Sequence, residues 1–282
     1  MKKIISSVLA LVLLISALTV FSSCSKQIEI AIPNDTTNEA RALLLLQNAG
    51  IIKVDGTKGL TATVKDITEN PKNIKFIEVE AAQIPNKLKD VDYAVINTNY
   101  ALAAGLNPAK DALSVEGSAS AYGNILSVKA GNEQTPKTLA LKAALESKQV
   151  ADYITEQYKG SVISIVDNPG NGYDASVDYE ALKGTTITVA ASPTPHAEIL
   201  AVAKTILADK GITLEIKEFQ DYDQPNEVVE SGEIDANYFQ HVPYMNSFNS
   251  EKGTHIVSVS AIHVEPMGVY GGKQSDLKAI KD

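Results

Sequence analysis

A unit made of a strand, a polar turn and a helix occurs twice in this chain, and it limits the possible folds more than any other feature. Residues 28–32 and 185–190 each have the pattern of a strand, and a polar loop containing proline follows both. A helical stretch then ends at Gly50-Ile51 in the first copy and at Gly211-Ile212 in the second. The repeat predicts two α/β lobes that present loops and helix N-termini at the carboxyl ends of parallel strands, where open α/β sheets bind ligands. The alternative is that any two strand–helix units look alike at this level.

The rest of the chain also alternates β-rich and helical stretches. We expect the first helix to be capped by Thr36 or Thr37 and to stop at Gly50. Residues 167–178 have no periodicity and many turn formers, which is typical of a linker. Further strands are predicted at 74–79, 91–97, 111–116, 122–129 and 161–166, and further helices near 98–105, 136–159 and 196–210.

The N-terminal segment has the form of a lipoprotein signal. Lys2-Lys3 precede an apolar run from Ile4 to Phe21, and Ser22-Ser23 lead to Cys24, the only cysteine. We expect residues 1–23 to be removed and Cys24 to be lipidated, so that the protein is anchored to a cell membrane, facing the periplasm or the exterior. A membrane-spanning helix and a buried structural thiol are the alternatives, although the run lacks the flanking charge that a span usually carries on its far side.

Composition narrows the possible partners. The formal net charge of −9 becomes more negative when Lys2 and Lys3 are removed, so no basic excess is left for nucleic acid or anionic lipid. A single cysteine excludes an internal disulfide and a cysteine-rich metal site. The length allows one large domain or two modest ones at ~100–200 residues each.

Several longer strings resemble a known family. Phe239-Gln240-His241 lies in one of them, and Asn38 and Arg41 lie in another. Together the strings resemble the substrate-binding lipoproteins of methionine ABC importers, the NlpA family. They are residues 32–47, 66–73, 94–98, 107–111, 219–227 and 232–244.

The order of these strings is exchanged relative to the family. Residues 185–282 resemble the family's first part and 28–166 its second, so the chain looks circularly permuted, with 167–184 joining the old ends. An assembly artefact or a piece of a tandem protein would give the same order. The resemblance implies a two-lobed α/β fold of the periplasmic-binding-protein type II class. We expect the first lobe at 24–120, completed by 273–282, and the second at 121–272.

The resemblance also implies a ligand, and the side chains can be matched to its chemistry. Arg41 is the only arginine in the chain, and its planar fork suits a carboxylate better than lysine does. Asn38 and Asn97 would complete the polar end, although asparagines also cap turns. A thioether gains ~0.3–1.5 kcal/mol from each aromatic contact. The apolar end would be formed by Tyr222, Phe239, His241 and Tyr244, of which Phe239 and Tyr244 could simply be core residues. Residues 265–270 are expected to line the cleft without strong ligand contact.

Other functions have weaker support in the sequence. No nucleophile elbow, zinc-protease motif or phosphate-binding loop is present, so we expect no enzyme and no cofactor. The four histidines show no tight metal-ligand spacing and no activating carboxylate neighbour, so we expect no metal site. The predicted function is capture of methionine for an ABC importer's permease and ATPase subunits. A lipid-anchored adhesion protein is the alternative, and the choice among L-methionine, D-methionine and a methionyl peptide stays open.

Overall fold

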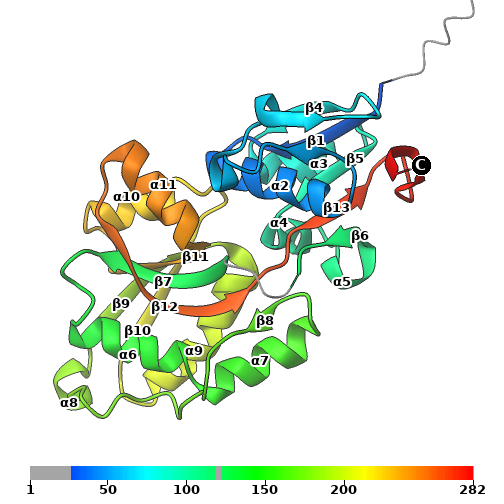
Figure 1. The fold of residues 1–282 in the computed structure, drawn as a ribbon. Coiled ribbons are helices and arrows are strands. Elements are labelled where there is room, and N and C mark those ends of the chain that lie inside the picture. The colour runs from blue at the N-terminus through cyan, green and yellow to red at the C-terminus, as the bar shows by residue number, and fades with distance from the viewer. Residues whose placement is uncertain (1–26, 118–121, 282) are drawn as a thin grey trace, which may run out of the picture.

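The computed structural model describes residues 27–117 and 122–281, which form two α/β lobes joined by two crossing segments (Figure 1). Each lobe is built on one main sheet, and in both sheets one strand lies between the next two strands of that sheet along the chain. This confirms the predicted two-lobed α/β fold. The predicted lipid anchor at Cys24 lies outside the described residues. Within the described ranges, no helix has both the length and the apolar character needed to cross a bilayer.

The first lobe contains a mixed five-stranded sheet that is buried on both faces. Ile30 and Ile32 pack on one face of the sheet, and Ala31 packs on the other, as the alternation of a strand requires. Helix α2 (Thr36–Asn48) covers the first face, and α3 (Ile84–Lys87) and α4 (Thr98–Ala103) cover the second. The strand order is β4 (Lys75–Val79), β1 (Glu29–Pro33), β5 (Tyr93–Ile96), β13 (Gly268–Gly271) and β6 (Ala112–Val115).

Shorter elements complete the first lobe. They are β2 (Lys53–Val54), β3 (Ile67–Glu69), the 3₁₀ turns η1 (Gly59–Thr61), η2 (Val64–Asp66) and η3 (Ala81–Gln83), α5 (Pro108–Asp111) and α12 (Lys278–Lys281).

The second lobe is built on a six-stranded sheet with helices on both faces. Its larger core lies under α6 (Pro136–Leu145), α7 (Lys148–Tyr158) and α9 (Glu198–Ala208). A smaller core lies on the other face under α10 (Gln224–Glu230) and α11 (Val242–Lys252). The strand order is β10 (Thr213–Glu218), β9 (Thr186–Ala191), β11 (Ala236–His241), β7 (Gly123–Lys129), β12 (Ile256–Val264) and β8 (Ile163–Ser164).

Every predicted strand position contains a strand, whereas β10, β11 and β12 were not predicted and two helix details differ. The helix predicted at 136–159 is two helices, because Ser147 adopts an extended backbone and caps α7 by accepting from Val150 N. The cap of α2 is Asp35 rather than Thr36 or Thr37, since its carboxylate accepts from Asn38 N. Gly50 follows the end of α2 with φ +75°, as expected.

Two crossing segments connect the lobes and lie side by side. One leads from Glu116 to Gly123, with 118–121 outside the described residues, and the other is 265–267. Glu116 N donates to Met267 O at 2.9 Å, and Met267 N donates to Glu116 Oε2 at 3.1 Å. The predicted second-lobe boundary at 272 is wrong, because β13 pairs with β5 and β6 in the sheet of the first lobe.

The two ends of the described chain meet on the first lobe (Figure 1). Asp92 Oδ2 accepts from Glu29 N near the start of the chain, and Asp92 Oδ1 accepts from Gln274 Nε2 near its end. Ile28 and Ile280 belong to the same apolar cluster. This proximity is what a circular permutation requires of the new ends.

The segment 167–184 is exposed along most of its length, although it is not featureless. It includes α8 (Tyr179–Leu182), which Asp178 caps by accepting from Ala181 N. Val177 and Leu182 pack on the main core of the second lobe. The segment therefore joins two parts of one lobe and is itself anchored there.

Candidate functional site

A cavity between the lobes brings together side chains from both. All seven residues that the sequence singled out as ligand contacts line it: Asn38, Arg41, Asn97, Tyr222, Phe239, His241 and Tyr244. Apart from the half-buried Tyr222, each of these side chains is buried, so the cavity is enclosed rather than an open groove. The structure thus places the predicted residues around one space, as expected for a small ligand.

The carboxyl ends of parallel strands supply much of the wall. Asn97 directly follows β5, and Phe239 and His241 end β11, which is parallel to β9. Asn38 and Arg41 lie three residues apart in the first turns of α2, so they share one face of that helix. The first βα repeat and the carboxyl end of β11 therefore converge on the cavity from opposite lobes, whereas no residue of the second repeat, 185–212, lines it.

Arg41 connects α2 to both crossing segments. Its Nε donates to Glu116 Oε1 at 2.8 Å, and its Nη2 donates to Glu116 Oε2 at 2.5 Å and to Glu265 O at 2.8 Å. The guanidinium also lies over the Tyr122 ring, with Cζ 4.3 Å from the centroid. Toward the described residues, the guanidinium donates through Nε and Nη2, which leaves Nη1 for a ligand carboxylate.

A chain of amides forms the polar end. The Asp35 carboxylate accepts from Asn38 Nδ2 at 2.9 Å, and Asn38 Oδ1 accepts from Asn97 Nδ2 at 2.8 Å. Burial raises the pKa of Asp35, while hydrogen bonds from Asn38 and Thr37 oppose that rise. At the end of this chain, Asn97 Oδ1 is buried and accepts no hydrogen bond from the described residues.

Aromatic rings form the opposite end. The ring centroids of Tyr222 and Phe239 are 6.0 Å apart, those of Tyr222 and Tyr244 are 5.7 Å apart, and those of Phe239 and Tyr244 are 6.1 Å apart. His241 Nδ1 accepts from Tyr244 N, so His241 caps α11 as well as lining the cavity. Burial and the nearby Arg41 lower the pKa of His241 well below its usual range, so the ring is neutral at pH 7.

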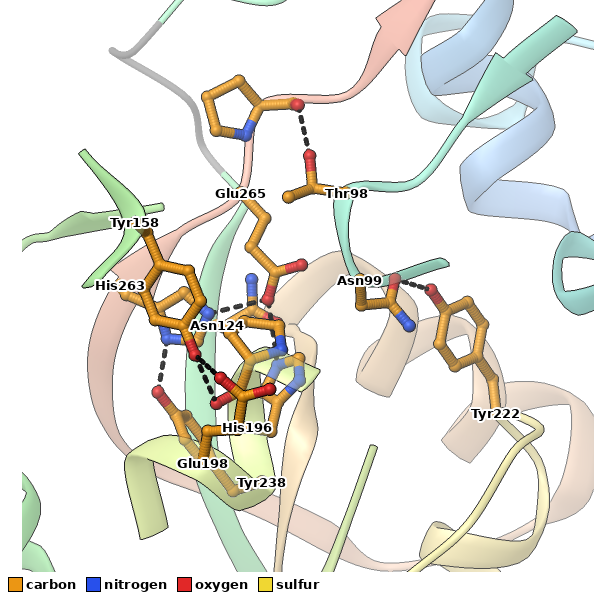
Figure 2. A network of polar contacts seen from close by, with 12 residues as sticks. Thr98, Asn99, Asn124, Tyr158, His196, Glu198, Tyr222, Tyr238, His263 and Glu265 are labelled. Atoms are coloured by element: carbon orange, nitrogen blue, oxygen red, sulfur yellow. Dashed lines mark hydrogen bonds and ion pairs between the residues drawn. The ribbon is translucent and has the colours of Figure 1, made fainter. Parts of the chain in front are cut away.

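Hydrogen bonds between the lobes hold the cavity shut. Tyr222 OH of the second lobe donates to Asn99 Oδ1 of the first at 2.7 Å. Tyr100 OH donates in the other direction, to Gln220 O at 3.0 Å. Figure 2 shows the Tyr222–Asn99 contact beside the buried polar network behind the cavity.

That network corrects the expectation that the histidines have no carboxylate partner. Glu265 Oε1 lies 2.7 Å from His263 Nε2 and 3.1 Å from His196 Nε2 (Figure 2). Burial lowers the pKa of each histidine to about 3, so both rings are neutral at pH 7, and it raises the pKa of Glu265. The local signal was the spacing His263-Val264-Glu265, while His196 comes from a distant part of the chain.

The same three side chains are the group in the described residues whose ligand atoms could share a cation, since the atoms lie within 4.8 Å of one another. Their other contacts favour hydrogen bonds instead. Tyr238 OH contacts His263 Nδ1, and Glu265 Oε1 faces Nε2 of the same ring, so both ring nitrogens already have hydrogen-bond partners within the protein. His196 Nε2 also faces Asn124 Oδ1 at 2.9 Å, which calls for an N–H there.

Five further residues line the cavity that were not among the predicted contacts. They are Thr98, Asn99, Asn124, Gln240 and Glu265. Thr98 and Asn99 directly follow Asn97, and Gln240 lies between Phe239 and His241, so adjacency to the predicted residues was the available signal.

Comparison with known proteins gives a family match over most of the chain. A family model described as NlpA lipoprotein matches residues 16–166 and 187–282. The unmatched stretch between these two matches contains the segment 167–184, which we interpreted from the sequence as the linker between the old ends. A match in two stretches is consistent with the permuted order.

Individual relatives match about half of the chain. The membrane lipoprotein TpN32 of Treponema pallidum is 49% identical over 135 residues, which are 48% of this chain and 50% of that protein. The D-methionine-binding lipoprotein MetQ of Escherichia coli K12 is 41% identical over 137 residues, 48% of this chain and 51% of that protein. The chain thus spans about half the length of the curated relatives it matches. A nutrient-binding protein from Burkholderia cenocepacia, solved bound to methionine, is 46% identical with a TM-score of 0.47, covering 50% of this chain and 61% of that one.

Proposed function

The chain belongs to the NlpA lipoprotein family, and from that premise we propose that it is a non-catalytic receptor that captures methionine for an ABC importer. The observation that carries the proposal is the enclosed cavity between the lobes, with a charged and amide-rich end and an aromatic end. A free amino acid with a thioether side chain has the same two ends. Relatives named D-methionine-binding lipoproteins support this choice of ligand.

The polar end would hold the ligand's α-carboxylate through Arg41. A bidentate or charge-assisted hydrogen bond from a guanidinium is among the strongest contacts available to a carboxylate. Glu116 and the Glu265 carbonyl accept hydrogen bonds from Arg41 and so fix the position of the guanidinium for that role. Asn38 supports the site indirectly, since it orients Asn97.

The aromatic end would receive the thioether. Tyr222, Phe239 and Tyr244 have ring centroids within about 6 Å of one another. Sulfur near ring edges gains ~0.3–1.5 kcal/mol per contact, so three rings favour methionine over a polar side chain of the same length. The enclosure of the cavity favours a single amino acid over a methionyl peptide, whose second residue would need an opening.

The partners follow from the same function. A lipid on Cys24 would keep the receptor at the membrane, where its loaded form meets the permease and ATPase subunits of an importer. The alternative role is adhesion. A lipid-anchored adhesion protein would need the anchor but would not need a ligand cavity between its lobes. Uptake of labelled methionine, compared between cells that have and lack the protein, separates these two roles. Equal uptake in both would argue for adhesion.

Isothermal titration tests the ligand directly. The protein without its leader should bind methionine at one site per chain, with a negative heat-capacity change because apolar surface is buried. Alanine, glutamate and lysine should bind at least tenfold more weakly, because alanine is too short to reach the aromatic end and the charged groups of glutamate and lysine would be desolvated there. Failure to bind methionine, or an equal affinity for alanine, would overturn the proposed ligand.

A further inference from the structure

The end of the first lobe that points away from the second lobe is rich in exposed lysines. Four segments meet there, and we call them the lysine-rich end: residues 27–29, 70–75, 87–92 and 271–281. They hold seven lysines, of which only Lys72 is half-buried, and four acidic residues, of which Asp92 is buried and Glu29 half-buried. The lysines are Lys72, Lys75, Lys87, Lys89, Lys273, Lys278 and Lys281.

Backbone hydrogen bonds hold these segments together. Lys75 N donates to Ile28 O at 2.8 Å, and Lys273 N donates to Val91 O at 2.9 Å. Figure 1 shows the start of β1 and helix α12 at the same end of the first lobe, remote from the second lobe. Lysines that lie far apart in the sequence therefore share one end of the folded protein.

The charge of the lysine-rich end is opposite to that of the whole protein. The chain has a formal net charge of −9, whereas lysines outnumber acidic residues at this end. Three of its lysines form no ion pair with another described residue: Lys72, Lys89 and Lys281. The ion pairs at this end are Lys75–Glu29 at 2.8 Å, Lys278–Asp276 at 3.4 Å and Lys87–Asp90 at 4.0 Å. The fold thus gathers a positive surface that the overall composition does not reveal.

The proposed lipid anchor is attached at the same end. Gln27 is the first described residue, and its Nε2 donates to Asn73 O at 2.8 Å, which holds the start of the chain on the lysine-rich end. Cys24 lies three positions earlier, and an extended chain spans at most ~3.3–3.6 Å per residue. The lipid is therefore attached within about 11 Å of Gln27. This distance is similar to the Debye length of about 8 Å at physiological ionic strength, so lysines at this end can act on charged headgroups.

We propose that the lysine-rich end docks on anionic phospholipid headgroups, so that the first lobe lies between the membrane and the second lobe. This inference rests on the lipid anchor of the proposed function, to which it adds an orientation. The occupant is a lipid surface because the short chain that starts here leads to the lipidated cysteine, and because positive side chains near an anionic leaflet are attracted to it.

The docked orientation leaves the ligand cavity free. Strands β1, β4 and β5 run parallel, and Lys75 and Asp92 lie at their amino ends, whereas Asn97 of the cavity follows the carboxyl end of β5. Methionine binding is therefore independent of docking. In the order of the family, the chain would begin near residue 185 of the second lobe. The exchanged order thus moves the anchor from the second lobe to the first.

Sedimentation with lipid vesicles tests the surface itself. The chain without leader and lipid should bind vesicles of equal parts phosphatidylglycerol and phosphatidylcholine at least about tenfold more strongly than vesicles of phosphatidylcholine alone. Added salt should weaken this binding, because exposed charges are screened. Equal binding to both kinds of vesicle would overturn the proposal.

A triple variant identifies the lysines responsible. Lys89→Gln, Lys278→Gln and Lys281→Gln together should weaken binding to the anionic vesicles by more than tenfold, because each lysine near such a surface contributes about fivefold. Arginine at the same three positions should retain the binding.

The matched control changes the net charge by the same amount on the second lobe, where it should weaken vesicle binding less than about twofold. It carries Lys148→Gln, Lys204→Gln and Lys217→Gln, all at exposed positions. An equal loss in both triple variants would show that net charge rather than the lysine-rich end decides binding, which would overturn the proposal. Both variants should bind methionine normally, since none of these lysines lines the cavity.

Fluorescence quenching in the lipidated, reconstituted protein tests the orientation. One fluorophore is attached through Ser275→Cys at the lysine-rich end and another through Ser250→Cys on α11, and both serines are exposed. A quencher on the lipid headgroups should reduce the signal at 275 at least twofold more than the signal at 250. Equal quenching would overturn the orientation. If the chain binds anionic vesicles but not methionine, the proposed function fails and the docking surface stands.

Discussion

Arg41→Lys probes the polar end of the cavity most sharply. The guanidinium makes a two-point contact with Glu116, at 2.8 Å from Nε and 2.5 Å from Nη2, and a third contact with Glu265 O. A lysine has a single nitrogen at its tip. If that nitrogen stays with the carboxylate of Glu116, which has 12% side-chain exposure, its three N–H donors all lie at one point and cannot reach a ligand carboxylate where Nη1 of the guanidinium lies.

The expected loss follows from the number of contacts. A hydrogen bond to a charged group contributes about 1.5–3 kcal/mol, and each 1.4 kcal/mol is tenfold in affinity. Losing one such bond to the ligand carboxylate should weaken methionine binding by about 10–150-fold. The free energy of unfolding of the variant should also fall by about 1–3 kcal/mol, because the guanidinium hydrogen bonds from α2 to Glu116 and to the Glu265 carbonyl are lost.

A second variant distinguishes ligand contact from scaffolding. Glu116→Gln disrupts the same ion pair but keeps the guanidinium, so its stability should fall while its affinity for methionine is retained or increased. Titration calorimetry gives the affinities, and urea unfolding gives the stabilities. Unchanged affinity in Arg41→Lys would refute the reasoning. Equal losses of affinity in both variants would show that Arg41 acts only through the crossing segments.

Three other predictions concern the aromatic end, the anchor and the chain order. Phe239→Ala should weaken methionine binding about tenfold and narrow its advantage over alanine, and an unchanged ratio in titration would remove Phe239 from the thioether site. Cys24→Ser should release the protein from the membrane fraction, and firm membrane binding of that variant would refute the lipid anchor. A chain rejoined from Asp282 to Gln27 through one or two glycines, and opened within 167–184, should fold and bind methionine as the original does, because the present ends of the chain meet near Asp92. Failure of the rejoined chain to fold, as followed by circular dichroism, would favour a tandem origin or an artefact over a permutation.

The local pattern of polar and apolar residues in the sequence was sufficient to predict much of the fold. The β1–α2 unit was predictable because strand alternation, Pro33 and Gly50 mark its limits within a few residues. The break between α6 and α7 was not, since Ser147 lies in the polar run Glu146-Ser147-Lys148-Gln149, which a continuous helix could also carry on its exposed face. Likewise, a choice between Asp35 and a neighbouring threonine as cap depends on backbone geometry that composition does not reveal.

The candidate site was predictable only where the resemblance supplied residues. Asn38, Arg41, Asn97 and the aromatic residues came from matched strings, and the structure places them around one cavity. Glu265 was expected only to line the cleft, because its importance depends on His196, which lies 69 positions earlier in the sequence and reaches Glu265 only in the folded protein. The partner of Arg41 was equally hidden, since Glu116 lies 75 positions away. Contacts between distant segments are set by topology, which local periodicity does not encode.

A crystal structure of the protein with methionine tests the central claim most directly. We predict one methionine in the cavity between the lobes, with its carboxylate on Arg41 and its sulfur among Tyr222, Phe239 and Tyr244. Methionine found outside this cavity, or an empty cavity in crystals grown with saturating methionine, would contradict the account.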